Sequence, residues 1–594
     1  MNMRITSALT LSVAGLAFFA AAACGETRGG FTPSPPGFDP NPPPDAGDCP
    51  FQCSIDGRSV VRSCTGEVIE TCPPEQACGA ASCQEPCSAA AADQSSNGCD
   101  FYFQSPATEP AYAGSCYATF IVNTSTQPVD VTLEREGKTL DLSKSMFRTA
   151  PGDATLFAHT GPIAPGESAI LFLSEASSAT ARYHVACPSG VTAAVLEDNA
   201  LSTTGIGSSF RLKSSAPVSL VAMHPFGGAA SFLPTATLLL PVVTWAKQHV
   251  LVAPWEAALY GGKRIIGLPT TQIVASEDDT ELTIRPTRDI TTGPGVNGTL
   301  ANVPATYRLD KGQHLQLVQL DELSGSIVSS NKPTTVFSGH TCAQIPATAG
   351  ACDVFQQQIP AYEHWGSEYV AVGYRPRLGD EDEAMPYRIV AARDGTRLDY
   401  DPTIPAGAPT ELSAGEVATF PAGVGDAFVV RTQDADHPIY LAAYMTGVEG
   451  GYFGAPGTGF KGDPEFVNVV PAGQYLSSYS FYADPTYAET SLVIVRAKSH
   501  GAFKDVWLEC AGNLTDFRPI GTRGDYEFTR VDLARGGLPG QTFGDKTCQT
   551  GLQRMKSEGP FTATLWGWGS YSSYAYPGGM ANRKLVTTPL DLLR

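Results

Sequence analysis

The sequence predicts an all-β protein made mainly of tandem, degenerate β-sandwich-like repeats. From about residue 100 onward, short runs rich in Val, Ile, Thr, Tyr and Phe alternate with polar turns, which is the pattern of strands and loops. The chain contains 60 glycines and 46 prolines, which interrupt helices and favour turns. Stretches with a helical period are scarce.

A recurring unit divides the β-rich region into four repeats. Each copy has a polar turn, a proline, an apolar strand and a glycine, as in SSNKPTTVFSGH, and the four prolines are Pro217, Pro333, Pro438 and Pro560. This pattern predicts repeats at approximately 100–232, 233–347, 348–455 and 456–594. We expect each proline at the first position of a strand, where its missing N–H lies outside the hydrogen-bonded ladder.

Other short patterns recur in the same order within the repeats. A predicted β-hairpin with an acidic turn covers residues 273–284 and 389–400, with a looser copy at 121–133. A glycine turn precedes a predicted strand at Gly166, Gly312 and Gly415. The last three repeats open with a proline and then an aromatic residue, at Pro241 and Trp245, Pro360 and Trp365, and Pro471 and Tyr475.

The length of the repeat separates two architectures. A unit of roughly 110 residues with six or seven short strands has the size of a β-sandwich module. A propeller blade needs only about 40–45 residues, so one repeat is too long for one blade. Two blades per repeat, closing an eight-bladed β-propeller, is the alternative to the tandem sandwiches that we favour.

The N-terminal residues carry export and tethering signals. An apolar run at residues 9–23 is too short to span a bilayer and is typical of a signal peptide. Its junction with Cys24 resembles a bacterial lipobox, so we expect residues 1–23 to be removed and Cys24 to carry a lipid. An ordinary signal peptide that leaves a soluble protein is the alternative. Residues 24–48 are rich in Gly, Pro and Asp and predict an extended tether.

The cysteine pattern predicts an oxidised, exported chain. Without Cys24 the number of cysteines is even (15 − 1 = 14), so all of them can pair. Eight lie within residues 49–99 and predict a small disulfide-rich module; a zinc site is disfavoured because no C-x2-C pair is present. The other six suggest the pairs Cys342–Cys352, Cys510–Cys548 and Cys116–Cys187.

The charge balance restricts the partners. The formal net charge is −20, which disfavours nucleic acid and a bare anionic membrane surface. It suits an ectodomain held at the membrane by a lipid anchor, with an extracellular protein or glycan as its ligand.

Aromatic residues near the C-terminus are candidate ligand-binding residues. Trp566 and Trp568 alternate along one predicted strand and therefore share a face, and Tyr571 and Tyr574 follow them. Such rings can stack on sugars or anchor a protein partner. The interpretation that we favour is that they fill the core between repeats.

An acidic run at residues 379–383 is the candidate metal site. Asp380 and Asp382 could contribute to Ca²⁺ binding, because hard cations need several oxygen ligands. The run lacks the glycine and the distal glutamate of an EF-hand, and a solvated hairpin tip is the favoured interpretation. No G-x-S-x-G, H-E-x-x-H or P-loop motif occurs, so no catalytic residue is assigned.

Two segments carry a resemblance to a known family. LSGSIVSSNKPTTVFSGHTCAQIP at residues 323–346, followed by CDVFQQQIP and Trp365, resembles the N-terminal domain of the IgGFc-binding protein family. The stretch GDPEFVNVVPAGQYLSSYSFYADPTYAETSLVIV at residues 462–495 is similar to a bacterial surface-lipoprotein branch of that family. The resemblance covers roughly residues 100–580 and implies ligand binding, and it brings no motif of catalytic residues.

These features predict a lipid-anchored binding or adhesion protein, exposed at the cell surface. Gly25 follows Cys24 in place of the aspartate that is typical of retention at the inner membrane, so we expect the outer membrane. One alternative is a secreted hydrolase acting on polysaccharide or peptidoglycan, because a carboxylate pair leaves no reliable sequence signature. Another is a structural component of the envelope.

Overall fold

The computed structural model describes residues 50–177, 181–197, 201–231, 233–260, 264–347, 350–379, 381, 383–449 and 457–590. The predicted signal peptide, Cys24, the tether and Cys49 lie outside the described residues.

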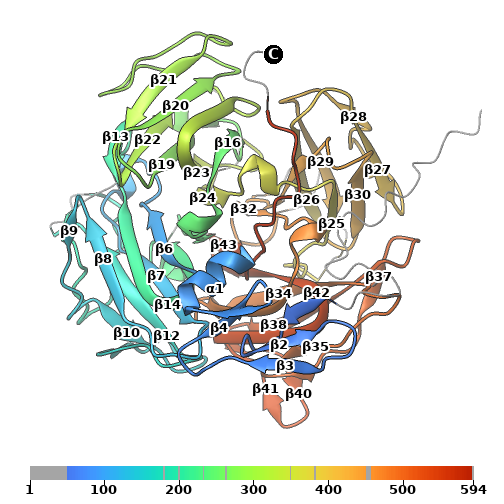
Figure 1. Cartoon of the computed structure of the whole chain (residues 1–594). Helices are drawn as coiled ribbons and strands as arrows, with labels where there is room; N and C mark the ends of the chain where they lie inside the picture. The colour runs from blue at the N-terminus through green and yellow to red at the C-terminus, as the bar shows by residue number, and fades with distance from the viewer. Residues whose placement is uncertain are drawn as a thin grey trace, which may run out of the picture.

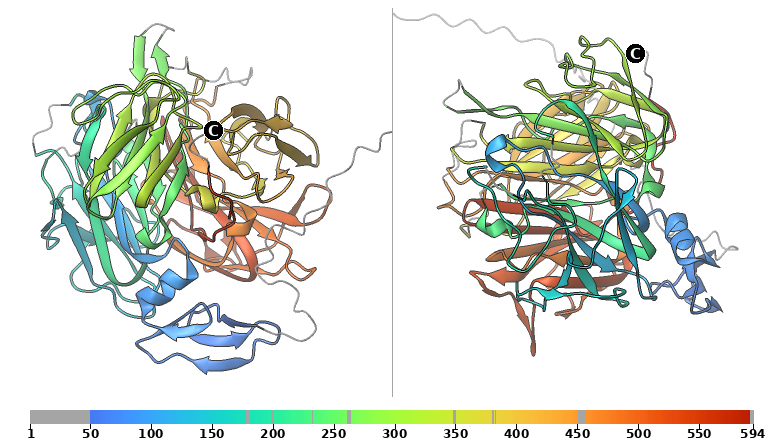
Figure 2. Two further views of the ribbon diagram at one scale, coloured as in Figure 1. Left: turned by 45° about the horizontal axis from the view of Figure 1, so that its top comes forward. Right: turned by 90° about the vertical axis from the view of Figure 1, so that its left-hand side faces the viewer.

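Four β-rich units are arranged in a ring, and a small Cys-rich module lies against one side of it (Figure 1). Both views in Figure 2 show this module projecting from the ring. Each unit has two antiparallel sheets with a buried apolar core between them, so the predicted all-β class of sandwich-like repeats is confirmed. The four units, each with two four-stranded sheets, surround a common centre (Figure 1).

The elements are grouped by unit, and β13, which precedes β14 in the chain, belongs to unit 2 because it pairs with β22. The Cys-rich module contains β1 (Phe51–Cys53), β2 (Ser59–Arg62), β3 (Val68–Thr71), β4 (Ala77–Gly79), β5 (Ser82–Gln84) and α1 (Pro86–Asp93). Unit 1 contains β6 (Gly98–Phe103), η1 (Pro110–Tyr112), β7 (Tyr117–Asn123), β8 (Val131–Arg135), β9 (Lys138–Thr139), β10 (Met146–Arg148), β11 (Phe157–Ala158), β12 (Ser168–Ser174), β14 (Phe210–His224), η2 (Gly228–Ala230) and β15 (Thr235–Leu238). Unit 2 contains β13 (Gly205–Ser208), η3 (Val242–Thr244), β16 (Ala246–Val250), β17 (Ala258–Tyr260), β18 (Arg264–Gly267), β19 (Pro269–Ala275), β20 (Thr280–Arg285), β21 (Ala305–Leu309), β22 (Gln313–Val318), β23 (Ile327–Ala343) and β24 (Asp353–Ile359). Unit 3 contains η4 (Tyr362–His364), β25 (Glu368–Ala371), β26 (Ala384–Ala391), β27 (Thr396–Asp401), β28 (Glu411–Leu412), β29 (Val417–Gly423), β30 (Phe428–Thr432), β31 (Ile439–Met445) and β32 (Glu465–Asn468). Unit 4 contains η6 (Ala472–Gln474), β33 (Leu476–Ala483), β34 (Glu489–Ala497), β35 (Val506–Leu508), β36 (Gly512–Asn513), β37 (Arg518–Ile520), β38 (Tyr526–Arg535), β39 (Leu538–Pro539), β40 (Thr542–Phe543), β41 (Lys546–Thr547), β42 (Gly551–Gly569) and β43 (Ser572–Pro577).

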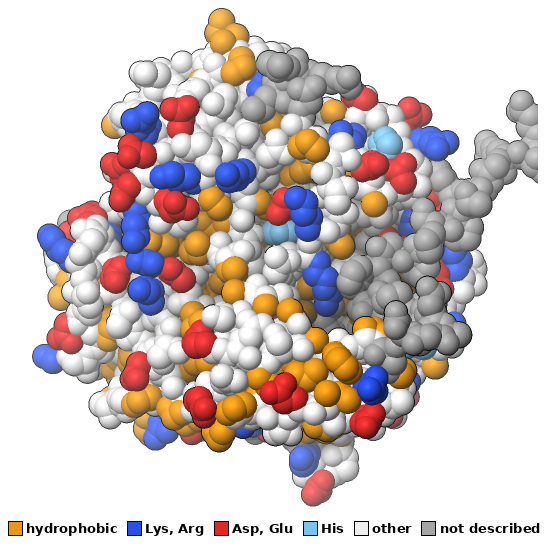
Figure 3. All heavy atoms as spheres, viewed as in Figure 1, with side chains coloured by type: hydrophobic (Ala, Val, Ile, Leu, Met, Phe, Trp, Pro, Cys, Tyr) orange, Lys and Arg blue, Asp and Glu red, His pale blue; other side chains and the backbone are white. Residues whose placement is uncertain are grey.

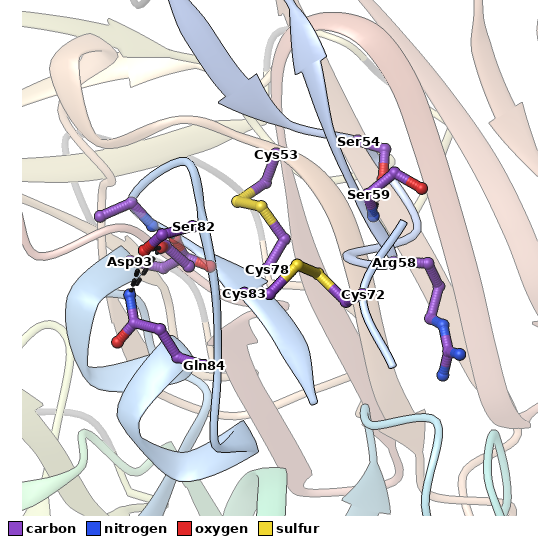
Figure 4. Close-up of a disulfide and its surroundings, with 12 residues drawn as sticks. Cys53, Ser54, Arg58, Ser59, Cys72, Cys78, Ser82, Cys83, Gln84 and Asp93 are labelled. Carbon is purple, nitrogen blue, oxygen red and sulfur yellow. Dashed lines mark hydrogen bonds between the residues drawn. A yellow bond between two sulfur atoms is a disulfide. The ribbon is translucent and has the colours of Figure 1, made fainter. Parts of the chain in front are cut away.

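Disulfides hold the Cys-rich module together. Cys53–Cys78 and Cys72–Cys83 cross its centre, as Figure 4 shows, and Cys87–Cys99 joins α1 to β6. Its only described hydrophobic cluster is built on Val60 and cysteines, so the module has too little apolar surface to hold itself without these bridges. Every cysteine that the structure describes is disulfide-bonded.

The four units share one strand order. The first sheets are β6–β14–β8–β9, β16–β23–β20–β21, β25–β30–β27–β28 and β33–β42–β35–β36. The second sheets contain β12–β7–β14–β15, β22–β19–β23–β24, β29–β26–β31–β32 and β38–β34–β42–β43. In units 1, 2 and 4, one long strand (β14, β23 or β42) belongs to both sheets, and in unit 3 its two halves are β30 and β31.

The recurring proline marks the point where the long strand passes from the first sheet to the second. Pro217, Pro333 and Pro560 lie inside β14, β23 and β42, and Pro438 separates β30 from β31. The register of β14 shifts between Lys213 and Val218. The expectation that each proline begins a strand is therefore wrong for three of the four. A residue without an N–H fits where the ladder changes partners.

The predicted hairpins are also wrong. In unit 2, β19 pairs with β22 and β23, whereas β20 pairs with β21 and β23, and the two strands do not pair with each other. The strands β26 and β27 of unit 3 are likewise in different sheets. The acidic turn therefore connects the two layers of a sandwich. The glycine turns do precede strands, and Gly166, Gly312 and Gly415 all adopt positive φ.

A proline, a 3₁₀ turn and a buried aromatic ring connect one unit to the next. The turns η3, η4 and η6 are followed by Trp245, Trp365 and Tyr475. The indole Nε1 of Trp245 donates to Leu240 O at 3.1 Å, and Trp365 makes the equivalent bond to Pro360 O at 3.0 Å. The aromatic residue that follows each proline in the sequence therefore fixes the junction between units.

The innermost strands of the second sheets close the ring. Contacts run from β15 to β24, from β24 to β32, from β32 to β43, and from β43 back to β15. Figure 1 shows β24, β32 and β43 near the centre. The chain after β43 pairs Ala581 with Ser95, beside the start of unit 1, so the two ends of the ring meet.

Candidate binding pocket and axial polar core

The two candidate tryptophans do not form an exposed surface. Trp566 and Trp568 of β42 are each 1% exposed and belong to the hydrophobic core of unit 3. The ring of Tyr374 lies 5.0 Å from that of Trp566, and the Arg375 guanidinium lies over Trp568 at 4.8 Å. Both rings therefore fill the core where units 3 and 4 meet, as the favoured interpretation expects, and the alternative of an exposed ligand-binding face does not hold.

The two tyrosines differ in exposure. Tyr574 of β43 is buried, and its ring lies 4.5 Å from that of Tyr487. Tyr571 is half-buried and lies 5.1 Å from the ring of Phe460, which is 59% exposed. Sequence analysis missed Phe460 because it lies more than 100 residues away and outside any strand. Both residues of this pair have positive φ, an uncommon backbone for an aromatic side chain.

The candidate metal residues Asp380 and Asp382 lie outside the described residues. Their described neighbour Glu383 accepts from the Nε of Arg377 at 2.6 Å, and both side chains are buried. Among the residues that the structure describes, no group of three or more His, Cys, Asp and Glu side chains is placed to hold a metal ion.

The structure joins each of the six later cysteines to a partner. The bonds are Cys116–Cys187 within unit 1, Cys342–Cys352 between β23 and β24, and Cys510–Cys548 within unit 4. None of these bonds joins two units, so the ring is held closed by packing and hydrogen bonds.

A pocket of about 380 Å³ lies where units 2 and 3 meet the C-terminal segment. Trp245 and Tyr362 form aromatic walls, Pro333 and Pro589 lie at its sides, and Val586 adds an apolar surface. The volume is within the range of small-molecule and side-chain sites. Figure 3 shows the face of the ring that is seen in Figure 1, with charged side chains scattered among apolar ones.

Hydrogen bonds from both units hold the C-terminal wall of this pocket. The backbone N–H groups of Leu585 and Val586 donate to Glu363 O at 2.8 and 3.0 Å. The hydroxyl of Tyr362 donates to Thr588 O at 3.1 Å. Gln248 exchanges two hydrogen bonds with the backbone of Leu590, at 3.1 and 2.9 Å. The pocket is therefore formed before any ligand arrives.

Three charged side chains line the pocket: Lys247, Lys584 and Glu363. The Nζ of Lys584 lies 3.2 Å from a carboxylate oxygen of Glu363. Burial, with further repulsion from His249 and Lys584, lowers the pKa of the adjacent His364 to about 3, so this imidazole is neutral. A pocket with a single carboxylate does not supply the acid and base pair of a glycosidase.

A second polar cluster, the axial polar core, consists of Asp353 and Gln357 of β24 together with Asp463 and Glu465 of the chain entering β32. The two N–H groups of the Gln357 Nε2 are shared among the carbonyl oxygens of Ala236, Phe466 and Ala575, at 2.8, 3.1 and 3.0 Å. One amide from unit 2 therefore binds units 1, 3 and 4. These four residues are all buried.

The carboxyl groups of the axial polar core favour their neutral form. Burial raises the pKa of Asp353 and of Glu465 well above the ordinary range, and raises the pKa of Asp463 to about 8. These residues are secluded from solvent, and the Oε1 of Gln357 makes no hydrogen bond among the described residues, so the cluster is separate from any site that is open to a ligand. Two sequence signals could have located it: three consecutive glutamines inside an apolar strand, and the acidic Gly-Asp-Pro-Glu step before β32.

Within the described residues, no helix has both the length and the apolar character needed to cross a membrane.

Sequence comparison places this ring of β-sandwich units in a known protein family. A family model described as IgGFc binding protein matches residues 235–567, more than half of the chain. The chain belongs to this family. The match begins in β15 and ends in β42, so unit 1 before β15 and the inner strand β43 lie outside it.

A curated relative is the human IgGFc-binding protein, which is 29% identical over 186 residues. The aligned part is 31% of this chain and only 3% of the human protein.

Proposed function

We propose that this chain is an exported, lipid-anchored protein that binds a protein ligand at the outer surface of a bacterial cell. Membership of the IgGFc-binding protein family carries the proposal, because proteins of this family are binding proteins. The lipobox-like junction at Cys24 and the Pro-rich tether behind it support the anchor and the display away from the membrane.

The architecture suits display of a binding surface. Thirteen described cysteines form disulfides, and such bonds are stable in the oxidising compartment that an exported protein meets. The pocket is held in one shape by hydrogen bonds from two units, and a preformed site loses less conformational entropy on binding. The name of the human relative makes the Fc part of immunoglobulin G the first ligand to test.

Two experiments test this proposal. The full chain, purified in detergent and immobilised, should bind immunoglobulin Fc or another member of an extracellular protein panel in a saturable way. Binding only to members of a glycan array would contradict a protein ligand. Separately, Cys24→Ala should move the protein from the membrane to the soluble fraction, and unchanged membrane partition would contradict the anchor.

A further inference from the structure

The pocket between units 2 and 3 has one cation available for a ligand. The side chain of Lys247 in β16 is exposed and makes no hydrogen bond or ion pair among the described residues. The second lysine, Lys584, is paired with Glu363. The net charge of the three side chains is therefore positive, in a chain whose overall charge is −20. A free cation beside apolar walls selects a ligand that carries one negative charge.

Apart from the exposed Thr587, the other polar side chains of the pocket are already occupied. The Tyr362 hydroxyl donates to Thr588 O and accepts from Arg393 at 2.9 and 3.1 Å. The Gln248 amide is bound to Leu590, and the hydroxyl of Thr588 donates to Asp436 at 2.6 Å. A sugar ring needs several free donors and acceptors for its hydroxyl groups, and this pocket offers few. A side chain that combines methylene groups with a single carboxylate needs only the cation and the apolar walls.

We infer that this pocket binds an acidic side chain of an extended polypeptide, with the ligand carboxylate on Lys247 and its methylene groups against Trp245. The inference rests on the proposed function, because it names the part of a protein ligand that the pocket takes. The volume of about 380 Å³ accommodates one such residue with its neighbouring backbone. The two prolines offer the ligand backbone no N–H groups, so recognition depends on the ligand side chain.

The test is calorimetric titration of the full chain with a tetraglutamate peptide, acetylated and amidated at its ends, and with its glutamine counterpart. At about 0.15 M salt, exposed charges more than about 8 Å away are largely screened, so the net charge of the chain does not decide the result. We expect the glutamate peptide to bind about two- to fivefold more tightly than the glutamine peptide, the discrimination expected of one solvent-exposed ion pair.

Variants at Lys247 assign the binding to the pocket. Lys247→Gln should remove that preference and Lys247→Arg should retain it, whereas Lys138→Gln, at an exposed lysine of β9 in unit 1, should change nothing. Equal binding of the two peptides, an unchanged affinity in Lys247→Gln, or stronger competition by glucuronate than by N-acetylglutamate would overturn the inference. A thermal melt of Lys247→Gln that matches the parent shows that its loss of binding is not loss of folding.

The two proposals fail in different ways. If tetraglutamate binds through Lys247 while no panel protein binds, the pocket assignment stands and the proposed function fails. If a panel protein binds equally to the parent and to Lys247→Gln, the proposed function stands and the pocket assignment is overturned.

Discussion

Replacing Asp463 by asparagine should flatten the dependence of the free energy of unfolding on pH. Burial holds the pKa of this carboxyl at about 8 in the folded protein, against 3.8 for an ordinary aspartate. Between these values the folded chain keeps a proton that the unfolded chain has lost. Stability is therefore fully present below about pH 4 and falls as pH rises toward 8, by about 1.4 kcal/mol for each pH unit.

The asparagine variant keeps a neutral side chain at every pH, so this contribution disappears. We expect Asp463→Asn to match the parent near pH 4 and to be more stable by a few kcal/mol at pH 7.5. The whole contribution of this carboxyl between its two pKa values is on the order of 5 kcal/mol. Urea unfolding followed by tryptophan fluorescence at intervals from pH 4.5 to 8 measures the difference. Asp545→Asn, at an exposed site, is the matched control and should follow the parent. Parallel profiles for Asp463→Asn and the parent would refute the reasoning.

Three further changes test the packing of the ring. Trp566→Ala should lower the free energy of unfolding by about 3–5 kcal/mol, because the ring is 1% exposed; a melt that matches the parent would contradict its place in the core. Arg377→Met should cost about 3–5 kcal/mol, because it leaves the carboxylate of Glu383 without its compensating charge in a largely buried site, and adding Glu383→Gln should recover most of the loss in urea unfolding. Replacing Cys510 and Cys548 together by alanine should lower the free energy of unfolding by about 2–4 kcal/mol, because the unfolded chain gains conformational entropy. An unchanged urea midpoint would contradict this entropic contribution.

Local patterns in the sequence predicted the class of fold because each depends on near neighbours. The strand content, the positive-φ glycines such as Gly312, and the aromatic residue after each proline all have local causes. Strand pairing does not have a local cause. The run at residues 273–284 has the alternation and the turn of a hairpin, yet both of its strands pair with β23, which lies about 50 residues further along the chain. The period of two determines which residues share a face, but it does not determine which strand is the hydrogen-bonded partner.

The candidate binding pocket could not be predicted for the same reason. Lys247, Tyr362 and Lys584 come from three segments far apart in the sequence, and none of them belongs to a local motif. The tryptophan pair shows that a local pattern also leaves the burial of a face undetermined. Alternation places Trp566 and Trp568 on one face, and only the neighbouring unit decides whether that face meets solvent or a core.

The cyclic contact of the four innermost strands sets a limit on how such proteins can vary. An open array of stacked repeats can be lengthened at either end, since each repeat meets only its neighbours. Here β15, β24, β32 and β43 already contact one another in a closed cycle, and the amide nitrogen of Gln357 lies within hydrogen-bond distance of backbone oxygens of the three other units. Duplicating one unit would open the centre and leave buried polar groups without partners. Proteins built on this ring are therefore expected to diversify through surface loops and attached modules, while the number of units stays at four.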